Sequence, residues 1–131
     1  MSDERFLQSI REISVDFIIV VAYGNLVNEE IIGHPKFLTI NVHASLLPKW
    51  RGAAPVQRSI LTGDTETGVT IMKVEKKLDA GPIIKQKKFL ILEEDTSNEI
   101  FEKIIKFGQP LLIETIKSCL LYTSDAADDM F

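Results

Sequence analysis

Three polar residues in this chain have side chains suited to chemistry on acyl groups. Asn41 and His43 end the apolar stretch FLTINVH, and Asp79 precedes the turn sequence Ala-Gly-Pro. Because side chains alternate along a strand, Asn41 and His43 point to the same side of it. Taken singly, each residue has an ordinary structural role, since a histidine at a strand end and an aspartate before a turn are both common.

As a set, the three side chains match the needs of moving an acyl group from one nitrogen to another. The transfer passes through a tetrahedral oxyanion, which an Asn amide or an imidazolium N–H can stabilise. It also takes a proton from the attacking amine and delivers one to the leaving nitrogen, and His with a carboxylate can relay that proton near neutral pH. We therefore predict that Asn41, His43 and Asp79 converge on one cleft at the carboxyl edge of a parallel sheet.

The elements that must position these residues alternate between apolar strands and helices. The run from Asp16 to Gly24 is apolar, β-branched and too short for a buried helix, which is typical of a strand covered on both faces. Thr96 and Glu99 form a capping box for a last helix, which Gly108 and Pro110 are expected to kink. This alternation predicts an α/β fold with a mostly parallel sheet. The expected elements are helices over 3–13, 28–33, 54–63 and 96–116, and strands over 16–24, 37–44, 68–75 and 81–92.

Composition places the chain among soluble globular proteins of one domain. It has 131 residues, of which 45% are hydrophobic, and a single cysteine, so no internal disulfide is possible. Apolar runs are shorter than the roughly 20 residues that a membrane helix needs, and the N-terminus does not resemble a signal peptide. The expected setting is cytoplasmic, without a membrane partner.

The last residues form a separate case. The stretch CLLYTSDAADD resembles a translated transposase-type sequencing adapter, so residues 118–131 are expected to be a non-native tail. Its three acidic residues account for most of the formal charge of −4. The charge of the remaining chain is therefore uninformative about partners.

Residues 40–84 carry a set of motifs that resembles the folate-dependent formyltransferase family, and within it the branch that acts on methionyl-tRNA. The motifs are N-x-H-x-S-L-L-P, R-G-A-A-P-V-Q, T-G-V-T-I-M and L-D-A-G-P, in this order. The resemblance extends from about residue 16 to residue 117. It implies a Rossmann-like formyltransferase core over residues 1–117, truncated at its N-terminus and without the family's C-terminal β-barrel domain.

The resemblance also implies substrates and roles. The donor is 10-formyltetrahydrofolate, the acceptor is the α-amino group of initiator methionyl-tRNA, no metal takes part, and the enzyme is a monomer. Two segments are implied to contact the folate. The implied catalytic residues are Asn41, His43 and Asp79, and the implied folate-contacting residues are Ser45, Leu46, Leu47 and Pro48 together with Tyr23, Gly24, Asn25 and Leu26.

Arg51 is a candidate for the acceptor side. A cation beside the segment from Ser45 to Pro48 can hold a negatively charged acceptor or a backbone carbonyl. The alternative for Arg51 is an arginine that is merely solvated in a loop. Trp50 is expected to pack against the domain.

Other functions remain open at this stage. The first alternative is a formyltransferase that acts on a UDP-linked amino sugar, which shares most of the motifs, and the second is glycinamide ribonucleotide transformylase. The segment RGAAPVQRSI favours the tRNA enzyme over both. A third alternative is a folate-binding or purely structural α/β domain without activity, because the chain begins on a helix and lacks much of the family's tRNA-binding surface.

Overall fold

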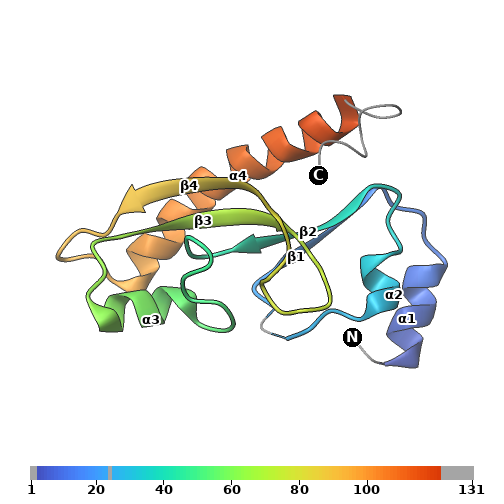
Figure 1. The fold of residues 1–131 in the computed structure, drawn as a ribbon, viewed down its shortest axis with the longest axis horizontal. Coiled ribbons are helices and arrows are strands. Elements are labelled where there is room, and N and C mark those ends of the chain that lie inside the picture. The colour runs from blue at the N-terminus through green and yellow to red at the C-terminus, as the bar shows by residue number, and fades with distance from the viewer. Residues whose placement is uncertain (1–2, 24, 122–131) are drawn as a thin grey trace.

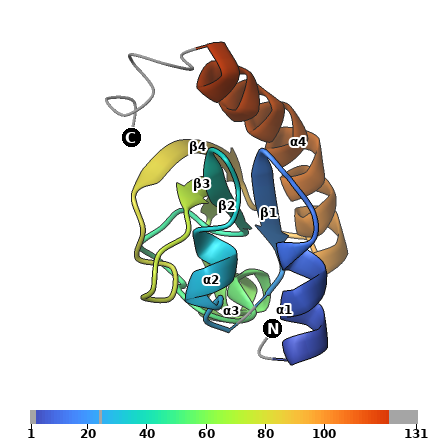
Figure 2. The same ribbon diagram turned by 90° about the vertical axis from the view of Figure 1, so that its right-hand side faces the viewer.

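The computed structural model describes residues 3–23 and 25–121, which form one mixed sheet with helices on both of its faces (Figures 1 and 2). Strands and helices alternate only in the first part of the chain, and β3 and β4 follow each other directly. The elements are α1 (Glu4–Arg11), β1 (Phe17–Val21), α2 (Glu29–Ile32), β2 (Leu38–His43), α3 (Pro55–Thr62), β3 (Glu66–Lys73), β4 (Ile83–Leu90) and α4 (Ser97–Leu121).

The sheet has the strand order β1-β2-β3-β4. β1 and β2 are parallel, whereas β2 pairs antiparallel with β3, and β3 antiparallel with β4. The α/β class is confirmed, but among the described strands the expected parallel arrangement holds only for the first pair. The physical reason at β3–β4 is the short connection over residues 74–82, because parallel neighbours need a crossover of a dozen or more residues.

The two faces of the sheet bury different clusters. On one face, α1 and α2 pack against β1, and on the other, α3 and α4 pack against β3 and β4, with Val42 of β2 beside them. Asn41 pairs with Val20 and so belongs to the face of α1 and α2, whereas Val42 points toward α4. The first cluster consists of Leu7, Val20, Val27, Ile31 and Val74, and the second of Val56, Val69, Phe89, Ile100 and Ile104.

The helix ends follow the sequence signals. Asp3 caps α1 by accepting from the Arg5 N–H, and Glu99 accepts from the Thr96 N–H as the capping box predicts. α4 continues through Pro110, and the expected kink there stays a prediction. α4 also includes Cys119, the first residue of the adapter-like stretch, whereas residues 122–131 of the expected tail lie outside the described residues.

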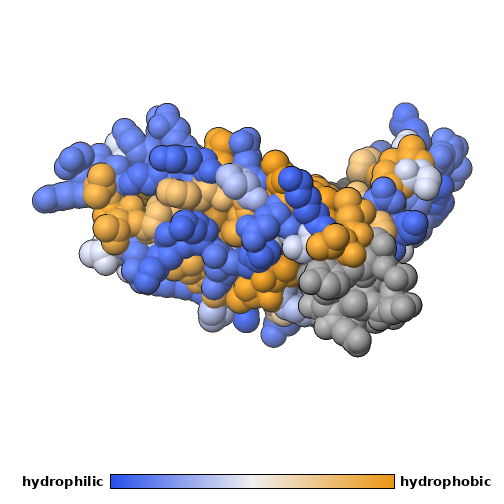
Figure 3. Space-filling model, turned by 90° about the horizontal axis from the view of Figure 1, so that it is seen from above, coloured by the Kyte–Doolittle hydropathy of each residue, from blue (hydrophilic) through white to orange (hydrophobic). Residues whose placement is uncertain are grey.

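One side of α4 remains partly apolar at the surface. Figure 3 shows apolar side chains between polar ones on the face that carries this helix. None of the helices in the described residues, including the 25 residues of α4, has the length and apolar character needed to cross a membrane. The large hydrophobic residues that α4 exposes are Phe101, Ile105, Ile113, Leu120 and Leu121.

Candidate active site

The structure brings Asn41, His43 and Asp79 together at the end of β2. The Asn41 amide donates from Nδ2 to Asp79 Oδ1 at 3.1 Å, and His43 Nδ1 lies 3.5 Å from Asp79 Oδ2. The residue exposures of His43 and Asp79 are 6% and 8%, so the pair is nearly removed from water. Buried polar groups of this kind are costly unless they are paired, and here each one is. The roles that the sequence predicts for them stay predictions.

Strand geometry and a tight turn bring these three side chains together. Asn41 and His43 are paired with Met72 and Thr70 of β3, so both side chains leave the same face. Asp79 lies beyond the end of β3 with φ +49, a left-handed conformation that Asp tolerates better than most residues. At Gly81 a Cβ atom would lie 1.9 Å from the Lys73 carbonyl oxygen, so only glycine lets the turn lie this close to β3.

Asn41, His43 and Asp79 form the candidate catalytic trio. The loop from Lys49 to Ala54 contributes two backbone groups that contact this trio. The Gly52 N–H donates to Asp79 Oδ2 at 2.7 Å, and His43 Nε2 lies 2.8 Å from the Trp50 carbonyl oxygen. These contacts escaped the sequence analysis because backbone groups carry no residue-type signal.

The Trp50 carbonyl determines how His43 carries its proton. Because a carbonyl oxygen only accepts hydrogen bonds, His43 Nε2 is the protonated nitrogen in this contact. His43 Nδ1 then faces the Asp79 carboxylate, with Oδ2 at 3.5 Å. Both ring nitrogens of His43 therefore have protein partners, and Nδ1 is the one that faces a titratable group.

The segment from Ser45 to Pro48 serves the loop itself in this structure. Ser45 Oγ donates to the Lys49 carbonyl, and the Leu47 N–H donates to Thr70 Oγ1 at 3.1 Å. Leu46 packs so closely on Gly68 that a Cβ atom there would lie 2.6 Å from Leu46 Cδ2. This segment lines neither of the two cavities at the trio, and its predicted contact with folate stays a prediction.

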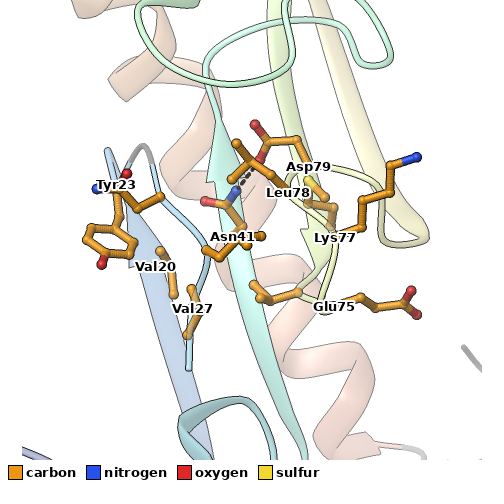
Figure 4. Close-up of a pocket in the computed structure, with 12 residues that line it drawn as sticks. Val20, Tyr23, Val27, Asn41, Glu75, Lys77, Leu78 and Asp79 are labelled. Atoms are coloured by element: carbon orange, nitrogen blue, oxygen red, sulfur yellow. Dashed lines mark hydrogen bonds between the residues drawn. The ribbon is translucent and has the colours of Figure 1, made fainter. Parts of the chain in front are cut away.

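A narrow cavity lies on the face of β2 that carries Asn41. It measures about 20 Å³, and Figure 4 shows Asn41 and Asp79 pointing toward each other at its wall while Glu75 and Lys77 extend outward. Of the segment 23–26 that is predicted to contact folate, Tyr23, Asn25 and Leu26 line this cavity, and Gly24 lies outside the described residues. Its lining consists of Val20, Tyr23, Asn25, Leu26, Val27, Asn41, Met72, Val74, Glu75, Lys77, Leu78 and Asp79.

A second, wider cavity opens at the carboxyl ends of β1 and β2 and extends to α4. It measures about 470 Å³ and is mostly apolar. Tyr23 and Asn41 line both cavities, and His43 lines the wide one. The remaining lining residues of the wide cavity are Val21, Ala22, Val42, Ala44, Gly52, Ala53, Ala54, Pro55, Gln57, Phe101, Ile104 and Ile105.

The two arginines of this region, Arg51 and Arg58, have different surroundings. The Arg51 side chain is exposed, and its role toward a substrate stays a prediction. The Arg58 side chain is half-buried and donates from Nη2 to the Arg51 carbonyl at 2.6 Å. Within residues 3–23 and 25–121, no group of three or more His, Cys, Asp or Glu side chains is arranged to hold a metal ion.

Asp64 anchors the start of the loop. Its carboxylate accepts from Lys49 Nζ and from Trp50 Nε1, each at 2.8 Å. Burial raises the pKa of Asp64, but the hydrogen bonds from Lys49 and Trp50 outweigh this effect and hold the pKa below its ordinary value. Trp50 thus packs against the domain, as expected, and its indole N–H is bonded to the charged carboxylate of Asp64.

Curated proteins similar to this chain include methionyl-tRNA formyltransferases. One from Wolbachia pipientis is 50% identical over 101 residues, which cover 77% of this chain and 34% of that protein. Another, from Staphylococcus epidermidis, is 43% identical over 126 residues, which cover 96% of this chain and 41% of that protein. The chain thus spans a third to two fifths of the length of these relatives.

Solved structures of formyltransferases with different acceptors share the fold of this chain. A phosphoribosylglycinamide formyltransferase from Bacillus halodurans matches with a TM-score of 0.79 at 32% identity, covering 93% of this chain and 62% of that one. A sugar N-formyltransferase from a Shewanella species matches with a TM-score of 0.71 at 26% identity, covering 88% and 45%. A family model described as formyl transferase matches residues 1–116. The chain belongs to the formyl transferase family.

Proposed function

We propose that this chain carries the reaction centre of a folate-dependent formyl transfer from 10-formyltetrahydrofolate to the α-amino group of methionyl-tRNA. The observation that supports it most is the position of Asn41. Like Tyr23, this side chain lines both cavities, and it is in addition hydrogen-bonded to Asp79, so it lies where a donor in one cavity and an acceptor in the other would meet.

The side chains have distinct tasks in this reaction. The acceptor nitrogen forms a bond to the formyl carbon, and the bond from that carbon to the donor nitrogen breaks. Asn41 Nδ2 has two N–H groups and uses one on Asp79, and the second, which has no partner among the described residues, can donate to the developing oxyanion. Asp79, with His43 beside it, takes the proton from the acceptor amine and returns it to the leaving nitrogen.

The donor side is assigned to the narrow cavity. Apolar walls from Val20, Leu26 and Val74 suit the faces of a flat ring, and Asn25 and Asp79 offer polar partners at its edge. Its present volume of about 20 Å³ is water-sized, so binding requires the loop that carries Glu75, Lys77 and Leu78 to move outward. The residues present fit the donor chemically.

The acceptor side is assigned to the wide cavity, and its lining favours the methionyl acceptor. An apolar side chain such as methionine gains from burial against Phe101 and Ile105. The described lining residues include no lysine or arginine, so a phosphorylated acceptor finds no counter-charge there. This is the property that separates the proposal from transfer to a ribonucleotide or a nucleotide-linked sugar.

The test supplies the protein with radiolabelled 10-formyltetrahydrofolate and compares three acceptors. We expect formyl label to appear on methionyl-tRNA and not on glycinamide ribonucleotide or on a UDP-linked amino sugar. Label on either of the other two acceptors would reject the assignment of the acceptor. Thermal stabilisation by a folate analogue without any transfer would identify the chain as a folate-binding fragment without activity.

A further inference from the structure

Arg58, on α3, holds a peptide unit that contacts the trio. The Arg51 carbonyl accepts from Arg58 Nη2 at 2.6 Å, and the Gly52 N–H donates to Asp79 Oδ2 at 2.7 Å. This carbonyl and this N–H belong to the same peptide bond, which is a rigid plane. Arg58 and Asp79 therefore fix the orientation of that plane from its two sides.

The same guanidinium reaches the other backbone contact of the trio. Arg58 Cζ lies 5.5 Å from the centroid of the Trp50 ring, a distance at which a cation and an indole attract each other. The Trp50 carbonyl is the group that bonds to His43 Nε2. Arg58 thus contacts both residues that connect the loop to His43 and Asp79.

The backbone of this loop needs such support. Trp50, Gly52 and Ala54 have φ values of +60, +90 and +55, in a region that residues other than glycine seldom adopt. Conformations of this kind persist only where the surrounding structure fixes them. Asp64 fixes the first part of the loop through Lys49 and Trp50, and Arg58 fixes its centre.

The charge of Arg58 also has an electrostatic effect. A charged donor at the Arg51 carbonyl polarises the peptide, which makes the Gly52 N–H a stronger donor to Asp79. Arg58 Nε is buried and has no hydrogen-bond partner among the described residues. The guanidinium is therefore held in place by its contacts with the peptide and the indole.

We infer that Arg58 is a positioning residue. It orients the Arg51–Gly52 peptide toward Asp79, and through Trp50 it keeps the proton of His43 on Nε2. The contact stands on the geometry alone, whereas its consequence for catalysis rests on the proposed formyl transfer.

The experiment is an NMR measurement on the 131-residue chain that requires no activity. Amide hydrogen exchange is followed at Gly52, with Ile71 in the centre of β3 as the internal reference, and His43 is followed through its ring nitrogens. In the unmodified chain we expect the Gly52 amide to exchange at least about tenfold more slowly than an unprotected amide. Arg58→Met should remove most of this protection at unchanged Ile71 protection, and should alter the His43 Nε2 signal.

Two variants complete the design. Arg5→Met removes an exposed arginine of α1 that lines neither cavity, and should leave the Gly52 and His43 signals unchanged. Arg58→Lys should restore part of the Gly52 protection, because lysine can still donate to the Arg51 carbonyl. In an active protein containing this chain, Arg58→Met should lower kcat about tenfold with both KM values within a few-fold.

Several results would overturn the inference. A folded Arg58→Met chain with unchanged Gly52 exchange shows that Arg58 only packs. If that variant does not fold, an unprotected Gly52 amide in the unmodified chain decides against the inference just as clearly. A chain that transfers no formyl group but loses Gly52 protection in Arg58→Met contradicts the proposed function and leaves the positioning contact established.

Discussion

The two cavities that meet at Asn41 differ in size, lining and support. The narrow one, about 20 Å³, lies on one face of β2 and is closed by the loop after β3. The wide one, about 470 Å³, lies at the strand ends between α4 and the loop that follows Gly52. A single cavity would suit a hydrolase or a binding protein, whereas two unlike cavities that share Asn41 and Tyr23 suit a transferase with two unlike substrates.

Because the two cavities differ, residues that affect substrate binding can be told apart from residues that affect the transfer step. Residues that line one cavity alone should affect one substrate, and residues between the cavities should affect the transferred group. The kinetic and binding predictions test that separation in an active protein that contains this chain.

The largest effect on kcat is expected for the residues that lie between the two cavities. Asn41→Ala should lower kcat by ~10²–10³, because it removes a donor to the oxyanion, and should leave donor affinity within a few-fold. His43→Ala should behave similarly, and the double variant should lose much less than the product of the two losses because the residues act as a unit. Asp79→Asn should lower activity with the fold intact. Steady-state kinetics beside a folate-binding titration measures these effects.

A parallel loss of donor affinity and kcat in Asn41→Ala would contradict this separation. Asn41 would then be a binding residue of the narrow cavity, and its assignment to the oxyanion would be wrong.

The site shows how far sequence reasoning reaches. Strand alternation placed Asn41 and His43 on one side, and that part followed from periodicity alone. The meeting with Asp79 depends on Gly81, whose missing side chain lets the turn approach β3. A turn signal in the sequence shows that the chain bends but does not show where the bend leads.

The rest of the site depends on groups that leave no trace in the residue pattern. The contacts from Gly52 and Trp50 are made by backbone atoms. That the side chain of Arg58, rather than that of Arg51, contacts the loop depends on which side of α3 faces the loop. The direction of β3 was missed for a similar reason, since an apolar strand reads the same in a parallel and in an antiparallel pair. The helices and strands themselves were expected close to their observed places.

The next effect is expected in the wide cavity. Ala53→Leu places an isobutyl group in this cavity, so it should raise the acceptor KM about tenfold, corresponding to ~1.4 kcal/mol, with donor affinity unchanged. Ser9→Leu adds similar bulk to an exposed position on α1 and should change neither constant. An equal loss of donor affinity in Ala53→Leu would show that the two cavities are not separate sites.

A smaller effect is expected in the narrow cavity. Leu26 lines only the narrow cavity, and this residue is 57% exposed, so a bound ring would cover part of it. Leu26→Ala should weaken donor binding about fivefold, or ~1 kcal/mol, at unchanged acceptor KM. Leu61→Ala, on an exposed leucine of α3 that lines neither cavity, is the matched control. Isothermal titration with a folate analogue reports the difference, and an acceptor defect in Leu26→Ala would reverse the assignment of the cavities.

The smallest effect concerns the anchor of the loop that borders the wide cavity. Asp64→Asn should lower the free energy of unfolding by about 1 kcal/mol at neutral pH, because the charged acceptor for Lys49 and Trp50 is lost. The folded-state pKa of Asp64 is below its ordinary value, so this stability is present above the unfolded pKa of about 3.9 and is lost as pH falls through the folded value. The difference between the unmodified chain and Asp64→Asn in urea unfolding should therefore shrink below about pH 4.

Asp16→Asn, at an exposed carboxylate, makes the same change in net charge without removing the partner of Lys49 and Trp50, and is the matched control. In the active protein, Asp64→Asn should raise the acceptor KM two- to threefold, on the order of 0.5 kcal/mol, because Trp50 leads into the loop that lines the wide cavity. Donor affinity should stay unchanged, since none of Lys49, Trp50 and Asp64 lines the narrow cavity. A donor defect of equal size would mean that this loop supports both cavities alike, and that the wide cavity owes its distinct behaviour to α4 instead.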